Sequence, residues 1–94
     1  MAGPSLADFA GHVGETYEVT ADDGAVVPLR LDSATALPAS FREEGGFRLE
    51  WVGPGDPMLP QATYAFGRGG ESVYIFIVPV GRDTGGCRYE AIFV

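Results

Sequence analysis

The chain has 94 residues, 46% of them hydrophobic, and its 13 acidic against 6 basic residues give a formal net charge of -7. This length fits one domain, residues 1–94, since domains typically have about 100–150 residues, and the apolar content is too high for a disordered chain. All 6 basic residues are arginine. They are too few against the carboxylates to form a docking surface for nucleic acid or anionic lipid, so we expect neither partner.

A short helix is predicted at the N-terminus, over about residues 5–12. Ser5 followed by Asp8 resembles a capping box, in which a side chain and the backbone close the start of a helix. Gly11 is expected to end the helix. His12 follows Asp8 at the spacing of one helical turn, so the two side chains are predicted to pair on one helix face. The apolar residues at helical spacing are Leu6, Phe9 and Val13.

A β-hairpin is predicted next. Residues 15–20 and 26–32 both alternate apolar and polar side chains, and the Asp-Gly step that ends at Gly24 readily takes the positive φ of a tight turn. Pro28 lacks the N–H needed for a ladder hydrogen bond, so we expect an edge or a bulge there. Residues 32–41 are small and polar, and they fit either a frayed continuation of the strand or a crossing loop.

Four further strands are predicted from alternating apolar residues and from the glycine- and proline-rich turns between them. A turn at 43–46 precedes the first of these strands, and a loop at 53–57 follows it. The turn at 67–70 is interpreted as a plain hairpin rather than a phosphate-binding loop, because a strand and not a helix follows it. The strands are expected over residues 47–52, around Tyr64 and Phe66, over 73–80 and over 87–94.

The strand at 73–80 is apolar on both faces, which predicts that both faces are covered. The N-terminal helix is the simplest candidate for the second cover. If the helix lies elsewhere, Tyr74, Phe76 and Ile92 form an exposed apolar patch of the kind that marks an interface. These three are the predicted interface residues.

Short strands, glycine-rich turns and one small N-terminal helix indicate an all-β fold. A closed barrel leaves no free strand edge, which is an advantage for so small a chain. We therefore expect a small six-stranded antiparallel barrel, with a sandwich as the alternative.

The polar residues form no recognisable catalytic or metal-binding pattern. His12 is the only histidine and Cys87 the only cysteine, and nothing in the sequence places them together as a nucleophile and its base. Metal sites usually need several such ligands. The acidic pairs at 22–23 and 43–44 lie in predicted turns, where solvated carboxylates are ordinary. We expect no enzymatic activity, no metal and no cofactor.

Residues 1–10 lack the basic region and apolar stretch of a secretory signal. The longest apolar run, residues 73–80, is far shorter than the about 20 residues that a membrane-spanning helix needs. We therefore expect a cytoplasmic protein without a membrane partner.

Three stretches resemble a small bacterial family that is known only as a domain of unknown function. They are L-x-x-F leading to V-G-x-x-Y-x-V at residues 6–19, G-P with L-P-Q-A-T-Y at 53–64, and F-I-V-P-V-G with Y-E-A-I-F at 76–93. The chain has Ala62 where the family commonly has glycine, and Val94 where the family often has a polar residue. Neither departure threatens the fold.

The resemblance implies no catalytic residue, and it implies genes near those of the phage-tail-collar type. We therefore expect a noncatalytic structural or accessory protein that acts through protein–protein contacts, with another protein or with a second copy of itself, in a phage-tail-like setting. The alternative is a small-ligand-binding β-barrel. Aromatic side chains crowd the expected interior, which leaves little room for such a ligand.

Overall fold

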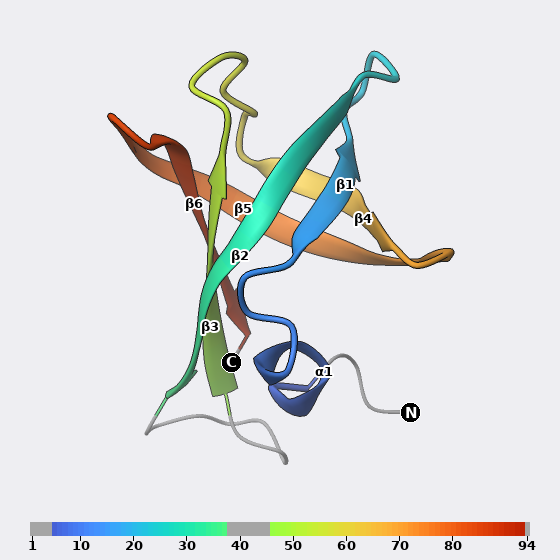
Figure 1. Ribbon diagram of the computed structural model, residues 1–94, viewed down its shortest axis with the longest axis vertical. Helices are drawn as coiled ribbons and strands as arrows, with labels where there is room; N and C mark the ends of the chain where they lie inside the picture. Colours follow the sequence, from blue (N-terminus) through green and yellow to red (C-terminus); the bar gives the residue numbers. More distant parts are fainter. Residues whose placement is uncertain (1–4, 38–45, 94) are drawn as a thin grey trace.

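The computed structural model describes residues 5–37 and 46–93. Six antiparallel strands close in a ring, a barrel with the strand order β1-β2-β3-β6-β5-β4, and one helical turn lies at its end (Figure 1). The predicted all-β barrel with a short N-terminal helix is confirmed. The elements are α1 (Ala7–Ala10), β1 (Thr16–Thr20), β2 (Val26–Leu37), β3 (Gly46–Gly53), β4 (Ala62–Arg68), β5 (Glu71–Asp83) and β6 (Gly86–Phe93).

Alternation along the strands decides which side chains fill the barrel. In β3 the side chains of Phe47, Leu49 and Trp51 are fully buried, while Arg48 and Glu50 between them are half-buried and face outward. The strands β1, β2, β4 and β6 follow the same rule, because successive side chains of a strand point to opposite faces. The largest fully buried side chains are those of Trp51, Tyr89, Phe47 and Phe66. The interior is thus a packed aromatic core.

The predicted hairpin is formed by β1 and β2, with Gly24 at φ 87 in its turn. Pro28 lies opposite Glu18 of β1, but the register between β2 and β3 begins only at Arg30. Pro28 therefore lies on an edge, as predicted. The strand β2 continues to Leu37, with a register shift between Leu31 and Ser33, so the segment from residue 32 continues the strand. The remainder of that segment and the turn at 43–45 lie outside the described residues.

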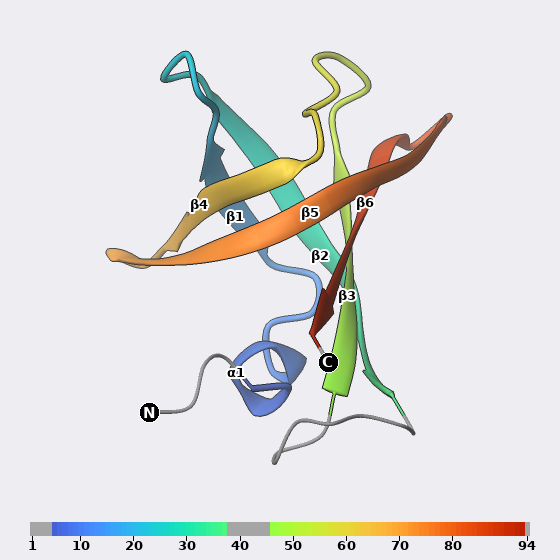
Figure 2. The same ribbon diagram turned by 180° about the vertical axis from the view of Figure 1, so that it is seen from behind.

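The long strand β5 changes partners along its length. Its first part, from Glu71 to Ile77, pairs with β4, and the part from Val78 onward pairs with β6. The end of β6, residues 91–93, pairs with β3 alone. Figure 2 shows β5 and β6 diverging from their crossing point. The ring is therefore closed at one end and split between β5 and β6 at the other.

The helix α1 lies at the split end of the barrel. Its only buried residue, Phe9, packs against Phe47 and Phe93, with ring centroids 6.0 and 6.4 Å apart. Two backbone hydrogen bonds hold the following turn to β2: Gly14 N–H donates to the Leu31 carbonyl and Leu31 N–H donates to the Glu15 carbonyl. The prediction that the helix covers the second face of β5 is wrong, because this tether keeps the single helical turn beside β2. None of the helical structure in the described residues has the length and apolar character that a membrane crossing requires.

Candidate functional site

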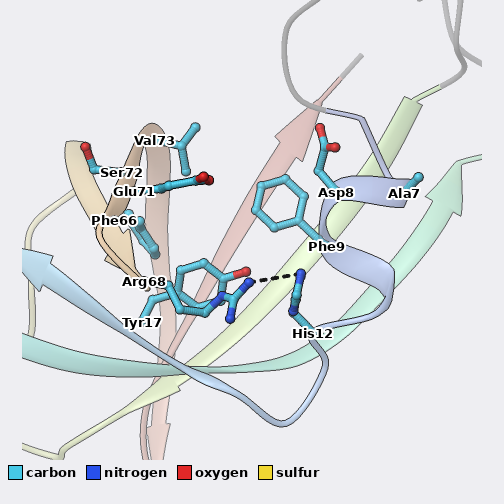
Figure 3. A pocket seen from close by; sticks show the side chains of 10 residues that line it. All are labelled: Ala7, Asp8, Phe9, His12, Tyr17, Phe66, Arg68, Glu71, Ser72 and Val73. Carbon is cyan, nitrogen blue, oxygen red and sulfur yellow. Dashed lines mark hydrogen bonds between the residues drawn. The ribbon is translucent and has the colours of Figure 1, made fainter.

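A cleft of about 670 Å³ separates α1 from the hairpin of β4 and β5 (Figure 3). Its apolar surface comes from Phe9 of the helix and from Tyr17 and Phe66, which belong to β1 and β4. The start of β5 forms one wall, through Glu71 and its two successors in the chain. The cleft therefore lies at the split end of the barrel.

A polar cluster of Arg68, Glu15 and His12 borders the cleft. Arg68 Nη1 lies 2.9 Å from Glu15 Oε1, and Arg68 Nη2 lies 3.1 Å from His12 Nε2. Because an arginine only donates hydrogen bonds, His12 Nε2 accepts this one, and the ring proton is left on Nδ1, 3.2 Å from Glu15 Oε2. The three side chains thus orient one another, and all three are accessible to solvent.

Tyr17 joins this cluster to the aromatic core. The Arg68 guanidinium lies 5.7 Å from the centroid of the Tyr17 ring, which makes an edge-on contact with Trp51 at 5.0 Å. Burial raises the pKa of Tyr17 above its ordinary value, while the hydrogen bond and the charge of Arg68 act to lower it. The Tyr17 hydroxyl is therefore neutral near pH 7. The indole Nε1 of Trp51 is buried, with no hydrogen-bond partner among the described residues.

The predicted interface residues are exposed large apolar side chains. Tyr74 is 74% exposed and Phe76 50% exposed on the outer face of β5, and Ile92 is 47% exposed on β6. Tyr74 and Phe76 are neighbours on one face, since they are two positions apart in a strand. Ile92 lies two positions beyond Glu90, the last β6 residue paired with β5, so the split of the barrel separates it from the other two. We call Tyr74 and Phe76 the apolar strip.

Of the other residues considered for catalysis or metal binding, Cys87 and the acidic turn residue Asp23 have structural contacts. Cys87 is fully buried at the start of β6, and its Sγ lies 3.4 Å from the carbonyl oxygen of Gly55. It is therefore not paired with His12, which contacts Glu15 and Arg68. Asp23 accepts the Ala25 N–H in the β1–β2 turn, as expected of a turn carboxylate. The acidic pair at 43–44 lies outside the described residues.

Three local predictions, on a pairing, a helix cap and a turn, have different outcomes. The predicted pairing of His12 with Asp8 is wrong, because α1 ends at Ala10 and the helical spacing does not reach His12. The Asp8 carboxylate instead accepts the Ser5 N–H at 2.8 Å, which is the backbone half of the predicted capping box. The turn between β4 and β5 is a plain hairpin, as predicted, with Arg68 opposite Glu71.

Neither the polar cluster nor the cleft is predictable from the sequence. Arg68 and His12 are 56 residues apart in the chain, and only the β1–β4 pairing that closes the ring brings them together. A single sequence carries no signal for such a contact. Within the described residues, no group of three or more His, Cys, Asp or Glu side chains is arranged to hold a metal ion.

A family model matches residues 4–93, nearly the whole chain, and is described as a domain of unknown function, DUF6916. The chain belongs to the DUF6916 family. Neither the curated proteins nor the solved structures include a significant match to this DUF6916 domain. The resemblance seen in the sequence is thus confirmed at the level of a domain of unknown function. The bacterial origin, the phage-tail setting and the cytoplasmic location stay predictions.

Proposed function

We propose that this DUF6916 domain is a noncatalytic accessory or structural module that binds another protein through the apolar strip on β5. The observation that carries the proposal is the exposure of Tyr74 and Phe76 side by side on one strand. Tyrosine and phenylalanine are enriched in protein interfaces, and a solvent-facing aromatic pair is costly for a domain that works alone.

The surroundings of the strip also favour a binding role over catalysis. The strand partners of Tyr74 and Phe76 in β4 are Ala65 and Thr63, which are short and leave both rings prominent. Arg68, Glu15 and His12 of the polar cluster are engaged with one another, and Cys87 is buried. In line with the family resemblance, we further propose a partner within a phage-tail-like assembly of a bacterial system.

A small-ligand site is the second candidate function, and the cleft favours it. A volume of about 670 Å³ lies within the range of about 300–1,000 Å³ that is typical of ligand pockets. The barrel interior is not the place for such a ligand, because Trp51, Tyr89 and Phe47 fill it. Such a ligand would have to bind in the cleft at the split end of the barrel, over Tyr17 and Phe66.

Photo-crosslinking tests the protein-binding proposal. A photoreactive residue at position 74 is expected to crosslink to one defined protein, while the same residue at position 26, where Val26 is 58% exposed, is not. Light scattering shows whether that partner is a second copy of the chain. The double variant Tyr74→Ser, Phe76→Ser is then expected to weaken the measured affinity at least about tenfold, as loss of an aromatic anchor does.

The control variant Val13→Ser, Val26→Ser removes two exposed apolar side chains elsewhere and is expected to bind like the wild type. Equal crosslinking from positions 74 and 26, or equal loss of affinity in the two double variants, would refute the proposal. Saturable binding of small apolar compounds that is abolished by Tyr17→Ala, together with no protein crosslink, would favour the ligand site instead.

A further inference from the structure

We infer that the partner binds as an added β-strand along the free edge of β5, residues 71–77, and that the bound segment is extended, with alternating apolar and basic side chains. The inference rests on the proposed function and specifies the binding mode and the chemistry of the partner.

The first feature is the strand edge. Residues 71–77 of β5 pair with β4 on one side, and no strand among the described residues pairs with them on the other side. The helix does not cover this edge closely, since its backbone contacts only β2. A free edge presents unpaired N–H and C=O groups, and addition of an extended segment to such an edge is a common mode of peptide recognition.

The second feature is the space beside the edge. The cleft runs between β5 and α1, with Glu71 and Val73 on one wall and Phe9 on the other (Figure 3). Neighbouring strands lie about 4.8 Å apart, so a segment paired with β5 would occupy the cleft and contact the helix. Figure 2 shows that the divergence of β5 and β6 widens toward the start of β5.

The third feature is the apolar strip. Side chains of an added strand that point to the outer face lie beside Tyr74 and Phe76, at the close spacing of cross-strand neighbours. Apolar side chains at these positions would cover both exposed rings. The apolar strip and the free edge therefore belong to one binding surface on the same stretch of β5.

The fourth feature is the charge of the cleft. Side chains of the added strand that point inward meet Glu71, which has no ion-pair partner among the described residues and points into the cleft (Figure 3). Asp8 adds a second carboxylate, whereas the nearby Arg68 is already paired with Glu15. The excess negative charge favours basic side chains on the inward face.

This charge also argues against a second copy of the chain as the occupant. Each chain carries a formal net charge of -7, so edge-to-edge pairing of two β5 strands would bring two acidic clefts together. Like charges across an interface are unfavourable. A basic, extended segment of another protein is the complementary partner.

Synthetic peptides test the inference directly. A fluorescently labelled peptide of alternating arginine and valine is titrated with the full chain at about 0.15 M salt, where the attraction between distant charges is largely screened. Its counterpart of alternating glutamate and valine is the matched control. We expect saturable binding of the basic peptide alone, with hydrogen exchange slowed at alternate amides of residues 71–77.

A pair of charge variants separates a specific contact from general attraction. Glu71→Lys is expected to weaken binding of the basic peptide by about fivefold or more, because a repulsion replaces an attraction at the edge. Asp22→Lys changes the net charge equally in the turn at the far end of the barrel, and it is expected to leave the affinity within about twofold (Figure 1).

Equal weakening by both variants, equal binding of both peptides, or slowed exchange that does not include residues 71–77 of β5 would overturn strand addition. Failure of the inference differs from failure of the proposed function. If no peptide protects β5 but the crosslinked partner still requires Tyr74 and Phe76, the strip binds protein by another mode. If no peptide protects β5 and the partner also binds without Tyr74 and Phe76, both proposals fail.

Discussion

At the residue scale, buried tyrosine hydroxyls hold the long loop between β3 and β4. The hydroxyl of Tyr89 accepts the Leu59 N–H at 2.8 Å, and the hydroxyl of Tyr64 donates to the Pro60 carbonyl at 2.7 Å. Tyr89 is fully buried, and so is most of Leu59, so their hydrogen bond is shielded from water. Alternation places both tyrosines in the core, but it gives no sign of these partners.

Tyr89→Phe removes the acceptor of the Leu59 N–H and leaves that buried donor unpaired. We expect the free energy of unfolding to fall by about 1–3 kcal/mol, the usual cost of a buried unsatisfied group. Urea denaturation measures the change. Tyr74→Phe is the control: its ring is 74% exposed, and we expect an effect within about 0.5 kcal/mol. An equal effect of the two variants would show that the hydrogen bond does not stabilise the fold.

At the element scale, two glycines lie where the end of β3 meets the start of β6. Gly86 starts β6 at φ +124, and a Cβ built on it would collide with the carbonyl oxygen of Gly53, the last residue of β3. A Cβ on Gly53 would in turn collide with the side chain of Leu29. The start of β6 thus lies close to the end of β3 because Gly86 has no side chain, and Gly53 leaves room for Leu29 of β2.

Gly86→Ala is expected to destabilise the protein by about 3 kcal/mol or more, because an unfavourable φ and a steric collision add up. Thermal unfolding monitored by circular dichroism measures the loss. The control is Gly81→Ala in β5. A Cβ added to Gly81 has nothing within 4 Å and the residue has no positive φ, so this variant should leave the melting temperature nearly unchanged. A similar loss in both variants would point to strand propensity rather than to the close approach.

At the scale of the whole molecule, the stability of the barrel depends on several neutral tyrosines. Burial is the main cause that raises the pKa of Tyr17, Tyr64 and Tyr89 above the ordinary value of 10.0. A raised tyrosine pKa means that the folded state holds its proton to a higher pH than the unfolded state does. Its stabilising contribution is therefore complete below pH 10 and is lost as the pH rises through and above that value.

We accordingly expect the denaturation midpoint in urea to fall as the pH rises through and above about 10. The chain contains no lysine, so lysine deprotonation does not contribute to this fall. Absorbance of ionised tyrosine measures the titration in parallel. The ionisation signal of Tyr17, Tyr64 and Tyr89 should appear together with unfolding. A midpoint that stays constant over this range would contradict the assignment of neutral, buried hydroxyls.

The sequence by itself determined the strands, the β1–β2 turn and, in the strands that alternate apolar and polar residues, which side chains are buried. Because apolar and polar residues alternate along a strand, the sequence shows which face of the strand is buried. Gly24 can take the positive φ that the turn requires. These are local properties, because neighbours in the chain specify them.

Only the tertiary structure decided what each face packs against. The pairing of β1 with β4 brings Arg68 to Glu15, and the tether to β2 places Phe9 over Phe47 rather than over β5. The split between β5 and β6, from which the cleft and the free edge arise, also depends on where pairing stops. Such features come from hydrogen bonds and contacts between segments far apart in the chain, and periodicity within a segment carries no information about its partner.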